Sequence, residues 1–267
     1  MSSLRLFAPL LLSLLAVAAP ATATERHFGF SYESGVLNAG QAEIQPWTTV
    51  RAGRANYFSR LEARLGFQLG LPHNLQAALF WDISSTAEDI RIPGATLDSR
   101  LTATEFQSLS AELKYKLTDP TADALGSALL LTGQAGPMLV GFEGRAIVDK
   151  QLGAFLLGLN LFYAGTEHLD ANSSAVASFG ASAAVGYFVT PNIVTSLELR
   201  NENRFSGELD YSVLYFGPTL SYASTRFWLT LAAQPQVIAF KGATSGYHLD
   251  LHENEYLQAR LLLGFPL

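Results

Sequence analysis

Apolar and polar residues alternate strictly along the stretch SRLEARLGFQLG, residues 59–70. Leu61, Leu65 and the other apolar residues fall on odd positions, whereas Arg60, Glu62 and Arg64 fall on even positions. An α-helix would mix the two sets, because successive side chains point to opposite faces only in a β-strand. The stretch therefore predicts a strand with one apolar face and one charged face.

The same alternation recurs along the chain and predicts an all-β fold. It yields about twelve candidate strands, each near the roughly 9–11 residues that a tilted strand needs to cross a bilayer. The candidates are residues 42–51, 59–70, 75–84, 106–117, 128–135, 139–150, 154–164, 176–189, 193–202, 211–222, 227–237 and 255–265. No linker or shift in composition divides them, so we expect one domain.

The predicted connections alternate in length. Those after even-numbered strands, such as LPHN, KQLG and TPN, are mostly short. Four of those after odd-numbered strands are longer, namely residues 85–105, 165–175, 203–210 and 238–254. Outer-membrane barrels have short periplasmic turns and longer outer loops. We therefore expect these four connections to be outer loops of an antiparallel, up-and-down transmembrane β-barrel.

The first residues predict export and leave a single barrel domain. Residues 1–23 combine Arg5, an apolar core and a small-residue site at Ala21–Ala23, as a cleaved signal peptide does, and the core is too short for a membrane helix. Residues 24–40 lack periodicity, and we interpret them as a periplasmic lead-in segment. Residues 41–267 are then the outer-membrane β-barrel, and the expected location is the cell outer membrane.

Charge and cysteine content exclude some classes of partner and fold. Without Arg5, 16 of the 17 Lys and Arg residues remain against 23 Asp and Glu residues, a net charge of −7. This balance argues against a nucleic-acid partner, which would need clustered basic residues. The chain has no cysteine, so an exported fold held by disulfides is excluded.

The alternating strands leave two interpretations open. A soluble β-sandwich would bury the apolar faces, whereas a membrane barrel turns them to lipid and its charged faces to the lumen. Apolar faces run through nearly every candidate strand, which favours the barrel. Aromatic residues near strand ends also favour it, because barrels place them at the membrane interfaces. These aromatic residues are Tyr57, Phe58, Trp81, Tyr115, Tyr163, Tyr187, Phe188, Tyr222, Phe227, Trp228 and Tyr256.

The stretch FGFSYESGVLNAGQAEIQPWTTVRAG, residues 28–53, resembles the opening of small, porin-like Gram-negative outer-membrane β-barrels. The resemblance assigns Gly40 and Glu43 to that opening without a defined role. It implies a barrel over the whole mature chain, in contact with outer-membrane lipids and inserted by the barrel assembly machinery. The chain departs from the usual aromatic ending of such barrels, because it ends Phe265-Pro266-Leu267.

Charged residues of both signs are expected to line the lumen. They are Glu43, Arg51, Arg60, Glu62, Arg64, Glu112, Lys114, Lys116, Glu143, Arg145, Glu198, Arg200 and Arg260. We expect a porin-like passive channel for small polar solutes, with no cofactor and no metal. The alternative is that these groups pair with one another and brace a closed barrel, because twelve strands lie between filled and open barrels.

Two further functions are weaker alternatives. A membrane-embedded lipid hydrolase would need a nucleophile and a base, but no Gly-x-Ser-x-Gly elbow accompanies the five histidines, so we expect no enzyme. His248, Asp250 and His252 would share a face of an extended loop and could hold a metal, although a solvated outer loop is the favoured interpretation. Partner binding through the acidic stretch of residues 84–105 is the remaining alternative.

Overall fold

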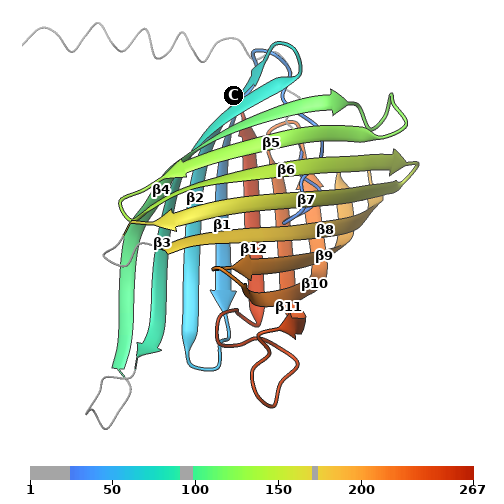
Figure 1. Ribbon diagram of the computed structural model, residues 1–267. Coiled ribbons are helices and arrows are strands. Elements are labelled where there is room, and N and C mark those ends of the chain that lie inside the picture. Colours follow the sequence, from blue (N-terminus) through green and yellow to red (C-terminus); the bar gives the residue numbers. More distant parts are fainter. Residues whose placement is uncertain (1–24, 91–98, 170–173) are drawn as a thin grey trace, which may run out of the picture.

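The described part of the chain contains twelve strands, and all of them pair antiparallel (Figure 1). The structure is a computed structural model that describes residues 25–90, 99–169 and 174–267, so the predicted signal peptide lies outside the described residues. The strands are β1 (Ala42–Ala52), β2 (Phe58–Leu71), β3 (Leu75–Ile90), β4 (Ser99–Thr118), β5 (Gly126–Ala135), β6 (Leu139–Leu152), β7 (Phe155–His168), β8 (Ser174–Thr190), β9 (Ile193–Phe205), β10 (Leu209–Ala223), β11 (Trp228–Lys241) and β12 (Leu257–Pro266). Each overlaps one of the predicted ranges, and the prediction of an antiparallel barrel of about twelve strands is confirmed.

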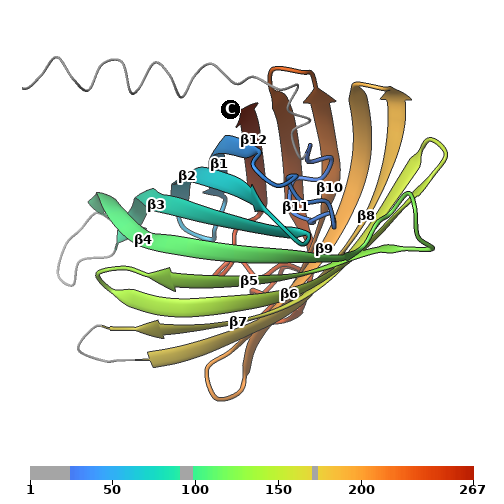
Figure 2. The same ribbon diagram turned by 90° about the horizontal axis from the view of Figure 1, so that it is seen from above.

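The sheet closes on itself between the first and last strands. Each strand pairs with its neighbours in sequence, and β12 returns to pair with β1. At this seam Trp47 lies opposite Leu262, and Thr49 lies opposite Arg260. Seen from above, the strands surround an interior (Figure 2). Closure leaves no unpaired sheet edge, which is what a strand structure in lipid requires.

Apolar side chains cover the outer surface. In β2 the exposed fractions of Leu61, Leu65 and Phe67 are 45%, 50% and 42%. The intervening Arg60, Glu62 and Arg64 point inward. A soluble sandwich would have the opposite sense, with its apolar residues inside. The distribution therefore matches a barrel whose outer wall meets lipid.

The two ends of the barrel differ in their connections. The turn end carries residues 72–74, 119–125, 153–154, 191–192 and 224–227, which are all short. The opposite end, which we name the loop end, carries the connections after odd-numbered strands. No helix in the described residues is long and apolar enough to cross a membrane.

Two of the expected outer loops are largely strand. β3 continues to Ile90 and β4 begins at Ser99, so residues 85–90 and 99–105 belong to a pair of strands that projects from the barrel (Figure 1). Residues 203–210 likewise form a tight hairpin between β9 and β10. Cross-strand contacts extend these ladders beyond the apolar band, such as Arg100 Nε to Asp89 Oδ1 at 3.0 Å. Only residues 242–256, between β11 and β12, form a long irregular connection among the described residues.

The expected aromatic girdle is partly wrong. Tyr57, Tyr115 and Tyr163 are exposed on the outer surface, but Phe58 and Trp228 are buried. Trp228 begins β11 on the inward-facing set, and its indole Nε1 donates to Glu43 Oε2 at 2.9 Å. Inward rings near strand ends fill the barrel instead of marking a membrane interface.

Candidate functional site in the barrel interior

The residues before β1 lie inside the barrel, not ahead of it. We name residues 26–38 the inner segment; they form neither strand nor helix and run within the ring of strands in Figure 2. Phe28, Phe30 and Leu37 have exposed fractions of 3% or less. The sequence predicts a periplasmic lead-in at residues 24–40, and the structure places residues 26–38 within the ring of strands. The inner segment is irregular, as expected, but side chains near the turn ends of the strands enclose it.

One carboxylate binds the backbone of the inner segment at three consecutive residues. The Glu198 side chain in β9 has no exposed surface and accepts hydrogen bonds from the N–H groups of Gly29 (2.6 Å), Phe30 (3.0 Å) and Ser31 (2.8 Å). The Thr219 hydroxyl donates to the same carboxylate at 2.5 Å. Convergent backbone N–H groups form an anion-binding concavity, and hydrogen bonds to a charged acceptor are the stronger kind. Glu198 therefore anchors the inner segment.

Other strand side chains extend this anchoring along the segment. Asn160 of β7 accepts from Tyr32 N at 2.6 Å and donates to Tyr32 O at 2.9 Å. Lys114 Nζ donates to the carbonyl oxygens of Glu33 (2.6 Å) and Gly35 (2.5 Å). Further backbone contacts come from Gln76, Asp149, Ser196, Thr230 and Arg260. Because polar side chains satisfy its backbone, the segment can be buried without strand pairing.

An ion pair folds the inner segment back on itself. His27 Nδ1 lies 2.7 Å from Glu33 Oε1, and the His27 backbone N donates to Glu33 Oε2 at 2.8 Å. Burial opposes the charged form of both groups, but the facing charges and hydrogen bonds outweigh it. They raise the pKa of His27 to about 10, with Glu25 adding to the effect, and lower the pKa of Glu33.

Gly29 lies where the inner segment meets the barrel wall. A Cβ built at this position would overlap the Cβ of Ala232 in β11. Neither backbone can move away freely, because Glu198 holds one and strand pairing holds the other. Glycine is therefore required here by close approach.

Three side chains separate the interior into two parts, and we name them the neck: Arg26, Tyr32 and Trp47. The rings of Tyr32 and Trp47 have centroids 6.5 Å apart, and the Arg26 guanidinium lies 4.2 Å and 5.0 Å from them. A cavity of about 190 Å³ on the turn-end side touches all three residues. A cavity of about 220 Å³ on the other side touches Tyr32 and Trp47, and we name it the arginine chamber. The neck is thus a constriction between two cavities, each of which is lined in part by charged side chains.

The arginine chamber adjoins a larger cavity of about 580 Å³, which we name the loop-end cavity. Ion pairs line its wall: Arg51 Nε lies 3.0 Å from Glu62 Oε1, and Arg64 Nε lies 2.6 Å from Asp82 Oδ1. Arg60 also pairs with Glu62, at 3.3 Å. The predicted alternation of sign along β2 thus produces cross-strand pairs that leave space between them.

The structure places the predicted lumen residues in three groups. Arg51, Arg60, Glu62, Arg64 and Arg260 border the loop-end cavity, Glu143, Arg145 and Arg200 border the arginine chamber, and Glu112 borders the cavity on the turn-end side. Lys114 also borders the cavity on the turn-end side, and both Lys114 and Glu198 bind the inner segment. Glu43 binds Trp228, and Lys116 pairs with Asp119 at the turn end. Gly40 takes a positive φ of 86° at the turn before β1. That these side chains contact a passing solute stays a prediction.

The connection between β11 and β12 folds inward at the loop end. Its Glu255 side chain is only 4% exposed and lies 2.5 Å from Arg54 Nη2 and 3.7 Å from Arg51 Nη1. Asp250 accepts from the backbone N–H groups of His252 (3.1 Å) and Glu253 (3.2 Å). The Asp250 carboxylate thus organises the loop, and no group of three metal-ligating side chains occurs in the described residues.

Sequence reasoning missed the neck and the anchoring of the inner segment. The odd position of Trp47 places it on the same face of β1 as Glu43 and Arg51, which was the available signal for its inward direction. Asn160 gave no signal beyond being polar. Glu198 gave one, because it lies opposite Gly217 and Ala184 and has no cationic cross-strand neighbour.

Comparison with known proteins agrees with this architecture. The family of unknown function DUF6662 matches residues 20–141 and 166–267. No curated protein sequence matches the chain. Among solved structures, the chain is similar to the COG4313 outer membrane channel from Pseudomonas putida F1, with 13% identity and a TM-score of 0.61 over 91% of this chain and 100% of that one.

Two other solved structures have lower scores. The NanC porin shares 11% identity, with a TM-score of 0.55 over 84% of this chain and 100% of that one. The translocator domain of the autotransporter NalP from Neisseria meningitidis shares 10%, with a TM-score of 0.52 over 85% and 88%. At these identities the likeness shows the fold, which is that of outer-membrane porin-like barrels.

Proposed function

We propose that this chain, which belongs to the DUF6662 family, is an outer-membrane channel for the passive passage of small polar solutes. The observation that carries the proposal is the pair of cavities, each lined in part by charged side chains, that meet at Tyr32 and Trp47. The apolar outer wall would contact outer-membrane lipid after insertion by the barrel assembly machinery. The loop end would then face outward and the turn end the periplasm.

The inner segment sets the size of solute that such a channel would admit. Barrels of eight strands are filled by their own side chains, and porins of sixteen or more leave a wide aqueous channel. Here the neck lies between the cavity of about 190 Å³ and the chamber of about 220 Å³. We therefore expect a narrow channel in which Tyr32 limits passage.

Single-channel conductance in a planar bilayer tests the proposal. The full-length wild type should conduct weakly, and Tyr32→Ala should conduct more, because removing the ring widens the neck. The contacts between Asn160 and the Tyr32 backbone survive this change. Tyr115→Ala is the matched control, since Tyr115 is 44% exposed on the outer surface, and its conductance should equal that of the wild type.

Two outcomes would contradict the channel. One is a folded wild type, judged by heat-modifiable migration on gels, that conducts no more than the empty bilayer. The other is equal conductance of Tyr32→Ala and the wild type. Either result would favour the second candidate, a closed barrel braced by its ion pairs and inner segment, which interacts through its loop end.

A further inference from the structure

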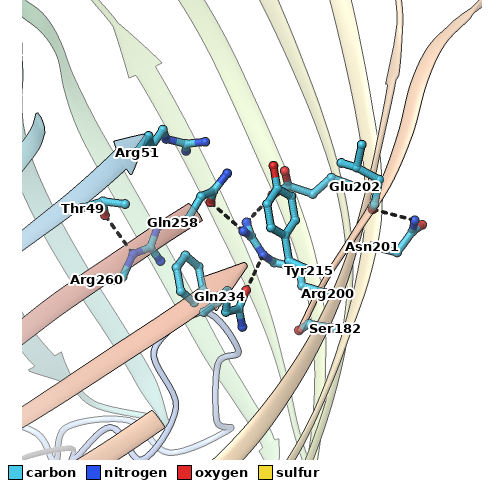
Figure 3. A network of polar contacts seen from close by, with 12 residues as sticks. Thr49, Arg51, Ser182, Arg200, Asn201, Glu202, Tyr215, Gln234, Gln258 and Arg260 are labelled. Atoms are coloured by element: carbon cyan, nitrogen blue, oxygen red, sulfur yellow. Dashed lines mark hydrogen bonds and ion pairs between the residues drawn. The ribbon is translucent and has the colours of Figure 1, made fainter. Parts of the chain in front are cut away.

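The wall of the arginine chamber carries more positive than negative side chains. Five arginines and two glutamates border this cavity of about 220 Å³, together with four aromatic rings. Phe30 and Tyr32 of the inner segment are two of those rings, so the segment forms part of the chamber wall. Figure 3 shows Arg51, Arg200 and Arg260 projecting into this region from β1, β9 and β12.

Arg260 differs from the other four arginines of the chamber. The other four form ion pairs, Arg51 with Glu62, Arg64 with Asp82, Arg145 with Glu143, and Arg200 with Glu202. No carboxylate of the described residues lies within 4.0 Å of the Arg260 guanidinium. Its cross-strand neighbours are Thr49 and Ala232, neither of which carries a charge. Among the described residues, Arg260 is therefore a cation inside the barrel without a directly paired carboxylate.

The contacts of Arg260 leave one edge of its guanidinium available. Nε donates to Thr49 Oγ1 at 3.0 Å and Nη1 donates to Gly29 O at 3.2 Å. Among the described residues, Nη2 has no hydrogen-bond acceptor. Both bonds fix the plane of the group, so its free donors keep one orientation.

A second guanidinium is held close to the first by the same ring. The Arg260 and Arg200 guanidinium carbons lie 4.2 Å and 4.4 Å from the centroid of Phe30. The ring face attracts each cation, but it carries no net charge, and like charges in a poorly hydrated interior repel. A bound anion would relieve this repulsion.

We propose that the arginine chamber binds a small organic carboxylate, with Arg260 as its main contact; this rests on the proposed channel function and names the class of its solute. A carboxylate accepts two parallel hydrogen bonds from a guanidinium, and such bonds are among the strongest in proteins. The inner segment contributes Phe30 and the Gly29 carbonyl that orients Arg260.

Calorimetric titration of the full-length protein in detergent tests the site without requiring conduction. The probes are gluconate and glucose, which have the same number of carbon atoms but differ in charge, and inorganic phosphate. Gluconate should bind saturably and glucose should not. Arg260→Gln should weaken gluconate binding about tenfold to a hundredfold, the range expected for a lost hydrogen bond to a charged group. Arg260→Lys should restore part of the affinity, and the exposed Arg100→Gln should change nothing.

The outcomes separate this proposal from the channel. Saturable gluconate binding by a wild type that does not conduct would support the site and overturn the channel. A wild type that conducts but binds gluconate no better than glucose would overturn the site and leave the channel standing. This outcome does not depend on whether Arg260→Gln folds. Equal gluconate binding by folded Arg260→Gln and by the wild type would also overturn the site. Binding of phosphate without binding of gluconate would overturn it as well.

Discussion

His27 and Glu33 make the docking of the inner segment sensitive to pH. The pKa of His27 is raised to about 10 from 6.5, so its contribution to docking is complete below about pH 6.5 and is lost as the pH rises through 10. The pKa of Glu33 is lowered from 4.5, so its contribution is present above that value and is lost as the pH falls further. The ion pair therefore stabilises docking most between about pH 4.5 and 6.5.

We predict that the inner segment becomes more mobile as the pH is raised from 6.5 to 10. The chain has no cysteine, so a spin label on Val36→Cys reports on this segment alone. In His27→Gln the label should be mobile already at pH 6 and change little with pH. His248→Gln, in the exposed loop, should behave like the parent. A label whose mobility is independent of pH in the parent would show that this pair does not hold the segment.

A second prediction at this scale concerns the outer surface. Leu65 and Leu101 are equally exposed, at 50% and 49%, but Leu101 lies on the projecting part of β4. Leu65→Arg should lower the free energy of unfolding by roughly 2–4 kcal/mol if the residue lies near the bilayer midplane, because arginine in hydrocarbon is costly. Leu101→Arg should cost less than about 1 kcal/mol, since it lies toward water. The free energies of unfolding are measured with denaturant in lipid vesicles. Equal losses for Leu65→Arg and Leu101→Arg would show that the apolar band is not centred on Leu65.

The strands could be predicted from the sequence because their signal is local. Leu61, Leu65 and Phe67 face outward because side chains alternate between the two faces of a strand, and the apolar residues of the other strands do the same. A period of two residues therefore identifies each strand. Strand ends were less predictable, because the hairpin of β3 and β4 continues through polar residues beyond the apolar band. The residue ranges were therefore too short at the loop end.

The inner segment could not be predicted, because its structure depends on residues far away in the chain. Tyr32 is held by Asn160, and Ser31 by Glu198, across 128 and 167 residues. A backbone that bonds to side chains has no periodicity of its own. The only signal was indirect: an inward carboxylate such as Glu198 without a cationic neighbour requires donors from another element.

Glu198 allows a prediction about the inner segment as an element. Glu198→Gln keeps the volume but replaces one acceptor oxygen by a donor, so it cannot serve all the N–H groups of residues 29–31. We expect docking to weaken by about 1.5–3 kcal/mol, the usual range for hydrogen bonds to a charged group. The Val36→Cys label should then be mobile and the conductance higher.

Glu143→Gln is the matched control for this change. Glu143 pairs with Arg145 and makes no hydrogen bond to the inner segment among the described residues. In Glu143→Gln the mobility of the Val36→Cys label should equal that in the parent. Unchanged mobility in folded Glu198→Gln would contradict the anchoring role of Glu198.

In the whole molecule, the interior is neither an open pore nor a packed core. Ion pairs such as Arg64 with Asp82 stiffen the wall around the loop-end cavity, while the inner segment fills the turn-end half. Paired charges and open cavities thus occur together in one barrel. Barrels of this strand number should therefore be compared by the residues that narrow their interior, as well as by their number of strands.

Docking of the inner segment depends on the correct assembly of the barrel. Its partners come from β3, β4, β6, β7, β9, β11 and β12, and each must point inward at the right height. A slip of one residue in any of these strands turns its side chains to the opposite face. A misregistered barrel would leave residues 26–38 without these partners. Burial of Phe28 and Phe30 therefore depends on the correct register of seven separate strands.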